Sequence, residues 1–133
     1  MLKTRGMRHL ALRVGDIERT AQFYKRVFGM TEVWSPDPDN IYLSSGCDNL
    51  ALHRASSVQS GDSNQPLDHL GFIVAGLDEL ESDYEEATKL GLKIVHPLRK
   101  HRDGSASFYI RDPEGNVIQV LYEPKISPLS FKK

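Results

Sequence analysis

Apolar and polar residues alternate in several short segments of the chain, and two of these segments begin with a histidine. "HLALRVGDI" starts at His9 and "HLGFIVAGL" starts at His69. Alternation with a period of two predicts β-strands, whose successive side chains point to opposite faces of a sheet. One face of each strand is therefore predicted to meet a core through Leu10, Leu12 and Val14 or Leu70, Phe72 and Val74. The opposite faces carry His9, Ala11 and Arg13, and His69, Gly71 and Ile73.

An amphipathic helix is predicted after each of these strands, because the apolar residues then recur at helical spacing. In "DIERTAQFYKRVFGM", Asp16 is the expected N-cap and Gly29 the expected stop. In "DELESDYEEATKLGL", Asp78 and Glu81 have the spacing of a capping box, and Gly91 ends the helix. The buried stripes are predicted to be Ile17, Ala21, Tyr24 and Phe28 in the first helix, and Leu80, Tyr84, Ala87 and Leu90 in the second.

Three further strands are predicted after each helix. They are "TEVW", "NIYLSS" and "NLALHRA" in the first half, and "LKIVHPL", "SASFYIR" and "NVIQVLYE" in the second, separated by turn-prone "SPDPDN", "SGCDN", "RKHRDG" and "DPEGN". The fold class is therefore α+β, a single domain of two tandem βαβββ modules whose curved mixed sheet surrounds a concave cleft. Module one spans residues 7–55, a polar linker 56–66, module two 67–123 and a C-terminal tail 124–133.

Composition narrows the class of partner. The chain has 133 residues and a net charge of -1, with 17 basic and 18 acidic residues interspersed, so no basic surface for nucleic acid or an anionic membrane is expected. Small molecules are the expected ligands. A single cysteine, Cys47, excludes an intrachain disulfide and suits a reducing compartment. Because the start "MLKTRGMRHL" is interrupted by charges and no apolar run has membrane-spanning length, we expect a cytoplasmic protein.

A family resemblance rests on several segments together: the paired modules, the helix end "FYKRVFGM", the strand opening "DHLGF" and the terminal "RDPEGNVIQV". These segments resemble the vicinal oxygen chelate superfamily, which includes glyoxalase I, fosfomycin-resistance proteins, bleomycin-resistance proteins and extradiol dioxygenases. The resemblance extends over roughly residues 7 to 123. It implies the glyoxalase/bleomycin resistance/dioxygenase fold. By the same resemblance, a homodimer is expected.

The resemblance also implies a metal site, with His9, His69 and Gln119 at three of the ligand positions and Ala51 near the fourth. Active members commonly have a glutamate where Gln119 stands. Two imidazoles and a carboxylate hold a divalent ion and leave positions for two substrate oxygens. A glutamine binds through its carbonyl oxygen but supplies no charge and no general base. The expected cofactor is a divalent ion of manganese, iron, nickel, cobalt or zinc.

Other residues are candidates for the same site. His53 and Glu123, displaced along their strands from Ala51 and Gln119, are candidate further ligands. Candidate pocket walls are Tyr42, Tyr109 and Arg111. The alternatives are local hydrogen bonds for the histidines, a satisfied buried amide for Gln119 and core packing for the tyrosines. His96 and His101, in or before the loop "PLRKHRDG", are predicted to be solvated and to lie outside any cluster.

The predicted function is a divalent-metal-dependent enzyme that acts on a small substrate with vicinal oxygens, as a glyoxalase-like lyase or isomerase. A metal-free protein that binds or sequesters a ligand, like bleomycin-resistance proteins, is the alternative, because Ala51 and Gln119 offer no carboxylate. Two further alternatives are an extradiol-type dioxygenase, against which Gln119 counts most heavily, and a thiol transferase resembling fosfomycin-resistance proteins.

Overall fold

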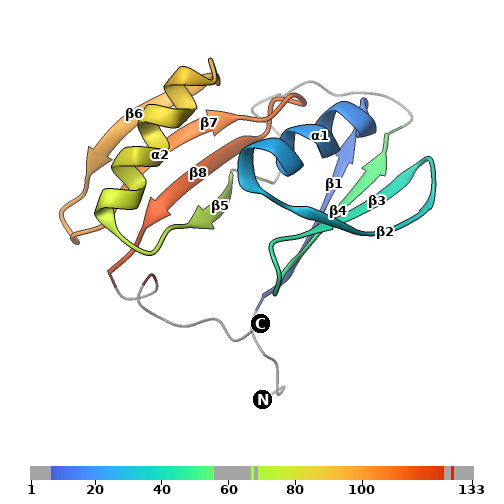
Figure 1. Ribbon diagram of the computed structural model, residues 1–133, viewed down its shortest axis with the longest axis horizontal. Coiled ribbons are helices and arrows are strands. Elements are labelled where there is room, and N and C mark those ends of the chain that lie inside the picture. Colours follow the sequence, from blue (N-terminus) through green and yellow to red (C-terminus); the bar gives the residue numbers. More distant parts are fainter. Residues whose placement is uncertain (1–6, 56–66, 68, 125–126, 128–133) are drawn as a thin grey trace. The chain divides into compact units, whose positions relative to one another are not determined.

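The computed structural model describes residues 7–55, 67, 69–124 and 127 of the chain. The chain divides into two compact units, Met1–Gln59 with Phe131–Lys133, and Ser60–Ser130. In the described residues each unit contains one helix and four strands in the order βαβββ (Figure 1). The predicted α+β class and the two tandem βαβββ modules are confirmed. The predicted linker 56–66 and most of the predicted tail lie outside the described residues.

Unit one is built around a four-stranded mixed sheet. Its elements are β1 (His9–Val14), α1 (Ile17–Phe28), β2 (Thr31–Asp37), β3 (Asn40–Ser44) and β4 (Asn49–Arg54). The strand order is β1-β4-β3-β2, in which β1 runs parallel to β4 and the other neighbours are antiparallel. The first strand of the module therefore pairs with its last, so β1 and β4 place their side chains next to each other.

Unit two repeats this arrangement. Its elements are β5 (Leu70–Ile73), α2 (Leu77–Lys89), β6 (Ile94–Lys100), β7 (Ala106–Arg111) and β8 (Val117–Tyr122), with the strand order β5-β8-β7-β6. The parallel pair is β5 with β8. Neither helix of the described chain has both the length and the apolar composition that a membrane span requires.

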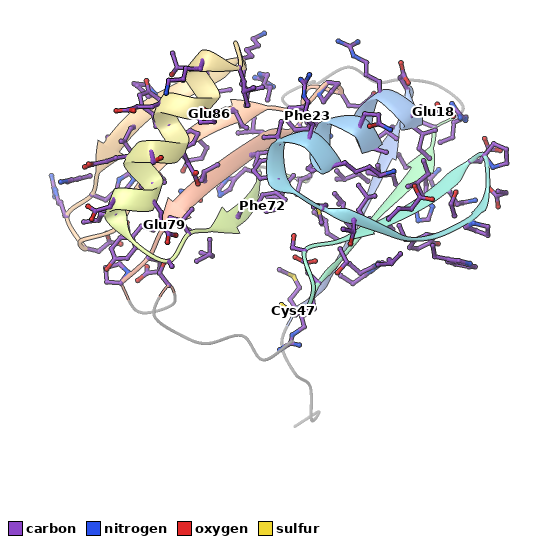
Figure 2. All side chains as sticks on the ribbon, in the orientation of Figure 1. Glu18, Phe23, Cys47, Phe72, Glu79 and Glu86 are labelled. Atoms are coloured by element: carbon purple, nitrogen blue, oxygen red, sulfur yellow. The ribbon has the colours of Figure 1, made fainter. Side chains whose placement is uncertain are left out.

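The caps of α1 are those that the sequence predicts. The Asp16 side chain accepts a hydrogen bond from the Arg19 backbone at 3.0 Å, and Gly29 ends the helix with φ 63°. The prediction for α2 was wrong, because Gly76 is its N-cap and Asp78 lies inside the first turn. Glu79, near the start of α2 in Figure 2, accepts instead from the Ala75 backbone N–H at 3.1 Å. An acidic side chain thus still satisfies a backbone donor at this helix start.

The cores lie between each helix and its sheet. Ile17, Ala21 and Tyr24 of α1 are buried as predicted, while Phe28 is half-buried. In α2, Leu80 and Ala87 are buried, and Tyr84 packs edge to face on Phe108 of β7 with ring centroids 5.2 Å apart. Leu90 is 43% exposed, against the prediction, because the helix ends at Lys89 and Leu90 lies in the cap that follows.

Edge strand β2 is longer than the sequence predicts, whereas edge strand β6 has the predicted length but spans Ile94–Lys100 in place of residues 92–98. β2 continues through Pro36 to Asp37, and β6 continues beyond Pro97 to Lys100, into segments that were expected to be turns. Proline lacks a backbone N–H, but an edge strand has one side without a hydrogen-bonded neighbour, so the proline is tolerated there. Register shifts accompany both prolines: Trp34/Asp37 in β2 and His96/Arg99 in β6.

Candidate functional site

One row of paired residues crosses each sheet at the same position of the repeat. Alternation places these rows on the face opposite the residues that pack under the helix. The unit-one row is Ala11, Ala51, Tyr42 and Trp34, and the unit-two row is Gly71, Gln119, Tyr109 and His96. The repeat therefore places an apolar and aromatic row in unit one and a polar row, with an amide and an imidazole, in unit two.

His9 is held by a neighbouring amide. It lies exposed on β1, in register with Asn49 of β4, and its Nδ1 is 2.7 Å from Asn49 Oδ1. Because Oδ1 only accepts, Nδ1 carries the proton, and the lone pair of the ring lies on Nε2. A metal-ligating histidine commonly has its second nitrogen held in this way. The role of Asn49 was not predicted, since finding it requires the parallel register of β1 and β4.

His53 has the same kind of partner. Its Nδ1 is 2.6 Å from Asn40 Oδ1, and its ring meets Tyr42 edge to face at 5.8 Å. Tyr42 in turn packs against Trp34, with ring centroids 4.9 Å apart. Trp34 is 58% exposed. This part of unit one therefore combines an oriented imidazole with an accessible aromatic pair.

In unit two, two histidines flank Tyr109. The His69 ring lies 5.6 Å from the Tyr109 ring at 84°, and the His96 ring lies 5.2 Å from it at 89°. The prediction that His96 lies outside any cluster was wrong. His96 is a strand residue, as predicted, and the antiparallel pairing of β6 with β7 places it in register with Tyr109.

Gln119 lies beside this cluster. Its neighbours along β8, Ile118 and Val120, are buried, and alternation places Gln119 on the opposite face, as predicted. It is half-buried, in register with Gly71 on one side and Tyr109 on the other. Its side-chain amide forms no hydrogen bond with any residue that the structure describes. Both its carbonyl oxygen and its amino group are therefore available to a ligand.

The other candidates take part in local contacts. Arg111 Nη1 donates to the Gly115 carbonyl at 2.6 Å, so part of this guanidinium supports the turn after β7. Glu123 follows the end of β8, and its backbone N–H donates to Ser127 Oγ at 2.9 Å. The Arg111 contact occupies part of the guanidinium that was predicted to line the pocket, whereas the Glu123 contact involves only the backbone of that residue.

His101 was predicted to be solvated, which is wrong. It is half-buried, and its Nε2 is 3.0 Å from the hydroxyl of the fully buried Ser107. In the same loop, Asp103 accepts from the Ser105 hydroxyl at 2.7 Å and from its backbone at 2.9 Å, and these hydrogen bonds lower the pKa of Asp103. The loop between β6 and β7 is thus fixed by its own polar contacts.

The donor chemistry of the predicted ligands suits a divalent transition metal. His9 and His69 supply neutral imidazoles, and Gln119 supplies an amide oxygen. Among the described residues, no three His, Cys, Asp or Glu side chains form a group that could hold a metal ion.

The model of the Glyoxalase/Bleomycin resistance protein/Dioxygenase superfamily matches residues 6–120. The chain belongs to this superfamily. A metallothiol transferase FosB from Lysinibacillus sphaericus (strain C3-41) is 24% identical over 115 residues, 86% of this chain and 80% of that protein. Virulence protein STM3117 from Salmonella typhimurium is 30% identical over 120 residues, 84% of this chain and 80% of that protein.

Solved structures of the superfamily have the same fold. A lactoylglutathione lyase from Agrobacterium tumefaciens superposes with a TM-score of 0.75 at 23% identity, covering 96% of this chain and 98% of that one. At this identity the likeness shows the fold alone. The family includes proteins named as metal-dependent, such as the FosB relative, but the reaction of this chain has to be inferred from its own residues.

Proposed function

We propose that the protein is a divalent-metal-dependent enzyme that acts on a small substrate with two neighbouring oxygen atoms. The proposed ligands are His9, His69 and Gln119. The observation that carries the proposal is the hydrogen bond from His9 Nδ1 to Asn49, which leaves His9 Nε2 to bind a metal. The equivalent position in the second module of the repeat is also a histidine, His69.

The proposed roles follow from the chemistry of each side chain. Asn49 fixes the tautomer and the ring orientation of His9. Gln119, without a hydrogen-bond partner among the described residues, offers Oε1 while keeping a neutral charge. A bound divalent ion would act as a Lewis acid on a substrate oxygen, and three neutral ligands would leave its full charge for that task.

The relatives support an enzyme but not one reaction. One relative is named a metallothiol transferase, and a structural neighbour is named a lactoylglutathione lyase. We favour a glyoxalase-like lyase or isomerase reaction, with thiol transfer as the nearest variant. An extradiol-type dioxygenase is less well supported, since position 119 carries no carboxylate.

Metal content tests the proposal. The purified protein, before and after incubation with manganese, iron, nickel, cobalt or zinc, should contain near-stoichiometric metal by elemental analysis. His9→Ala and His69→Ala should each lose it, whereas His101→Ala, which removes a histidine outside the proposed ligand set, should retain it. Absence of metal from the wild-type protein under every condition would refute the metalloenzyme.

A metal-free ligand-binding protein is the second candidate, favoured by the Trp34–Tyr42 pair. These rings lie 4.9 Å apart and Trp34 is 58% exposed, which suits stacking of an apolar or aromatic ligand. Because the chain has a single tryptophan, quenching of its fluorescence reports directly on this pair. Quenching by ligands in chelator-treated protein, together with absence of metal, would select this function.

A further inference from the structure

The turn between β2 and β3 supplies a chain of hydrogen bonds that ends at His53 of β4. Asp37, the last residue of β2, accepts through Oδ1 from Asn40 Nδ2 at 2.8 Å. Asn40 Oδ1 in turn lies 2.6 Å from His53 Nδ1. The same oxygen of Asp37 also accepts from the Asp39 backbone N–H at 2.8 Å, which fixes the carboxylate within the turn. A carboxylate, an amide and an imidazole are thus connected in series.

The carboxylate determines the orientation of the other two groups. Because a carboxylate only accepts hydrogen bonds, Asn40 must turn its NH₂ group toward Asp37 and its oxygen toward His53. The amide oxygen also only accepts, so His53 Nδ1 carries the proton and the lone pair of the ring lies on Nε2. Both hydrogen bonds run in one direction, so each polarises the next. This arrangement prepares the imidazole to accept a proton at Nε2.

The Nε2 atom of His53 is accessible to a molecule in solution. Among the described residues, no hydrogen bond or ion pair engages this atom, and no buried side-chain nitrogen or oxygen lacks a partner. An Nε2 atom without a partner is therefore not buried. The ring itself is half-buried and meets Tyr42 edge to face, with centroids 5.8 Å apart and planes at 81°. A fixed ring with one accessible lone pair suits general-base catalysis.

His53 lies next to the row of unit one that contains Ala11 and Ala51. Alternation puts His53 on the same face as Ala51, about 7 Å further along β4. Ala11, in register with Ala51, is exposed and has a short side chain, which leaves this part of the face open. Arg13, in register with His53, is also exposed. Its positive charge favours the negative charge that a substrate gains when it loses a proton.

We propose that His53 is the general base of the enzyme and that Asp37 and Asn40 are its positioning residues. This role rests on the proposed function and supplies the proton acceptor that the amide of Gln119 does not provide. In the step, a C–H bond next to the substrate carbonyl breaks, the proton goes to His53 Nε2, and the electron pair moves to the carbonyl oxygen. Return of the proton to the neighbouring carbon, with transfer of the hydroxyl proton between the two oxygens, completes an isomerisation.

The ring nitrogens of His53 test the positioning role without substrate or metal. In chelator-treated protein in mildly alkaline buffer, ¹H–¹⁵N spectra of the ring should show a protonated Nδ1 and an unprotonated Nε2. Asp37→Ala should free the Asn40 amide to rotate, so that both tautomers are populated. Asp39→Asn is the matched control, because it weakens the 2.7 Å ion pair with Arg54 and leaves the chain to His53 intact. A proton on Nε2 in the wild type, or an unchanged tautomer in Asp37→Ala, would overturn the proposal.

Hydrogen exchange at carbon tests the base itself. The probe is hydroxyacetone, which has neighbouring carbonyl and hydroxyl oxygens, and the readout is its deuterium uptake in D₂O with metal-loaded protein, measured by mass spectrometry. We expect uptake above the buffer rate. His53→Gln should slow it about 100-fold, because a positioned base contributes about 10²–10⁴-fold, and should retain its metal. His101→Gln, which removes a half-buried histidine of the loop between β6 and β7, should exchange like the wild type.

The base and the metal site fail in different ways. Absence of metal from the wild-type protein refutes the proposed function. Metal retained in both proteins, with equal exchange by wild type and His53→Gln, overturns the role of His53 alone. The same holds if the metal-loaded wild type gives no exchange above the buffer rate. Loss of metal in His53→Gln would make this residue a ligand and would also overturn its role as the base.

Discussion

Replacing Asn49 with alanine removes the amide that holds His9 without touching the proposed metal ligand itself. The Nδ1 to Oδ1 distance is 2.7 Å, and both residues belong to paired strands. Loss of a hydrogen bond that orients a ligating histidine typically costs about 10- to 100-fold in metal affinity. We therefore expect Asn49→Ala to weaken metal binding by about 1.4 to 2.8 kcal/mol. The free energy of unfolding should fall by less than about 1 kcal/mol, because this hydrogen bond is exposed.

The assay is competition for one divalent ion between the protein and a chelator of known affinity, with urea unfolding measured on the same samples. Asn40→Ala is the matched control, because Asn40 holds His53 through the same kind of bond at 2.6 Å. It should leave metal affinity unchanged unless His53 is a ligand. Unchanged metal affinity in a folded Asn49→Ala variant, with binding abolished by His9→Ala, would refute the orienting role of Asn49.

Three further predictions concern stability. The pKa of Asp83 is raised by partial burial and by Glu79, so the folded state disfavours its charged form. Asp83→Asn should therefore raise the free energy of unfolding slightly at pH 7, measured by urea unfolding, with the gain vanishing below about pH 3. The lowered pKa of Asp103 stabilises the fold above the ordinary aspartate pKa of about 3.9, so Asp103→Asn should destabilise at pH 7 and the difference should fade as acid titrates the wild type. Phe108→Ala, at 1% exposure beneath α2, should cost about 3–5 kcal/mol in urea unfolding, and a cost below 1 kcal/mol would contradict its core position.

The elements and buried faces could be predicted because they depend on local patterns. Alternation in "HLALRV" and "HLGF" predicts which residues lie away from the core, and Asp16 and Gly29 predict where α1 begins and ends. The start of α2 could not be fixed in this way. Several acidic residues lie near it, and Gly76, which has no side chain to form a cap, occupies the position.

The contacts of the site depend on register, which the sequence pattern does not provide. Asn49 meets His9 only because β1 and β4 pair in parallel with these two residues opposite each other. His96 meets Tyr109 only because β6 and β7 pair with these two residues opposite each other, after a register shift between Ile94 and His96. The face of Gln119 was predictable from alternation, whereas its neighbours and its lack of a hydrogen bond among the described residues were not.

The prolines of edge strands β2 and β6 also bear on how copies of this protein can associate. An edge strand with regular, unpaired backbone groups is a template for pairing with another chain. Pro36 in β2 and Pro97 in β6 each remove a backbone donor, and the adjacent register shifts distort the edge further. Strand addition at these edges, whether into fibrils or into a continuous sheet across a dimer, is therefore disfavoured. The opposite edges of the two sheets, β1 and β5, contain no proline and are not restricted in this way.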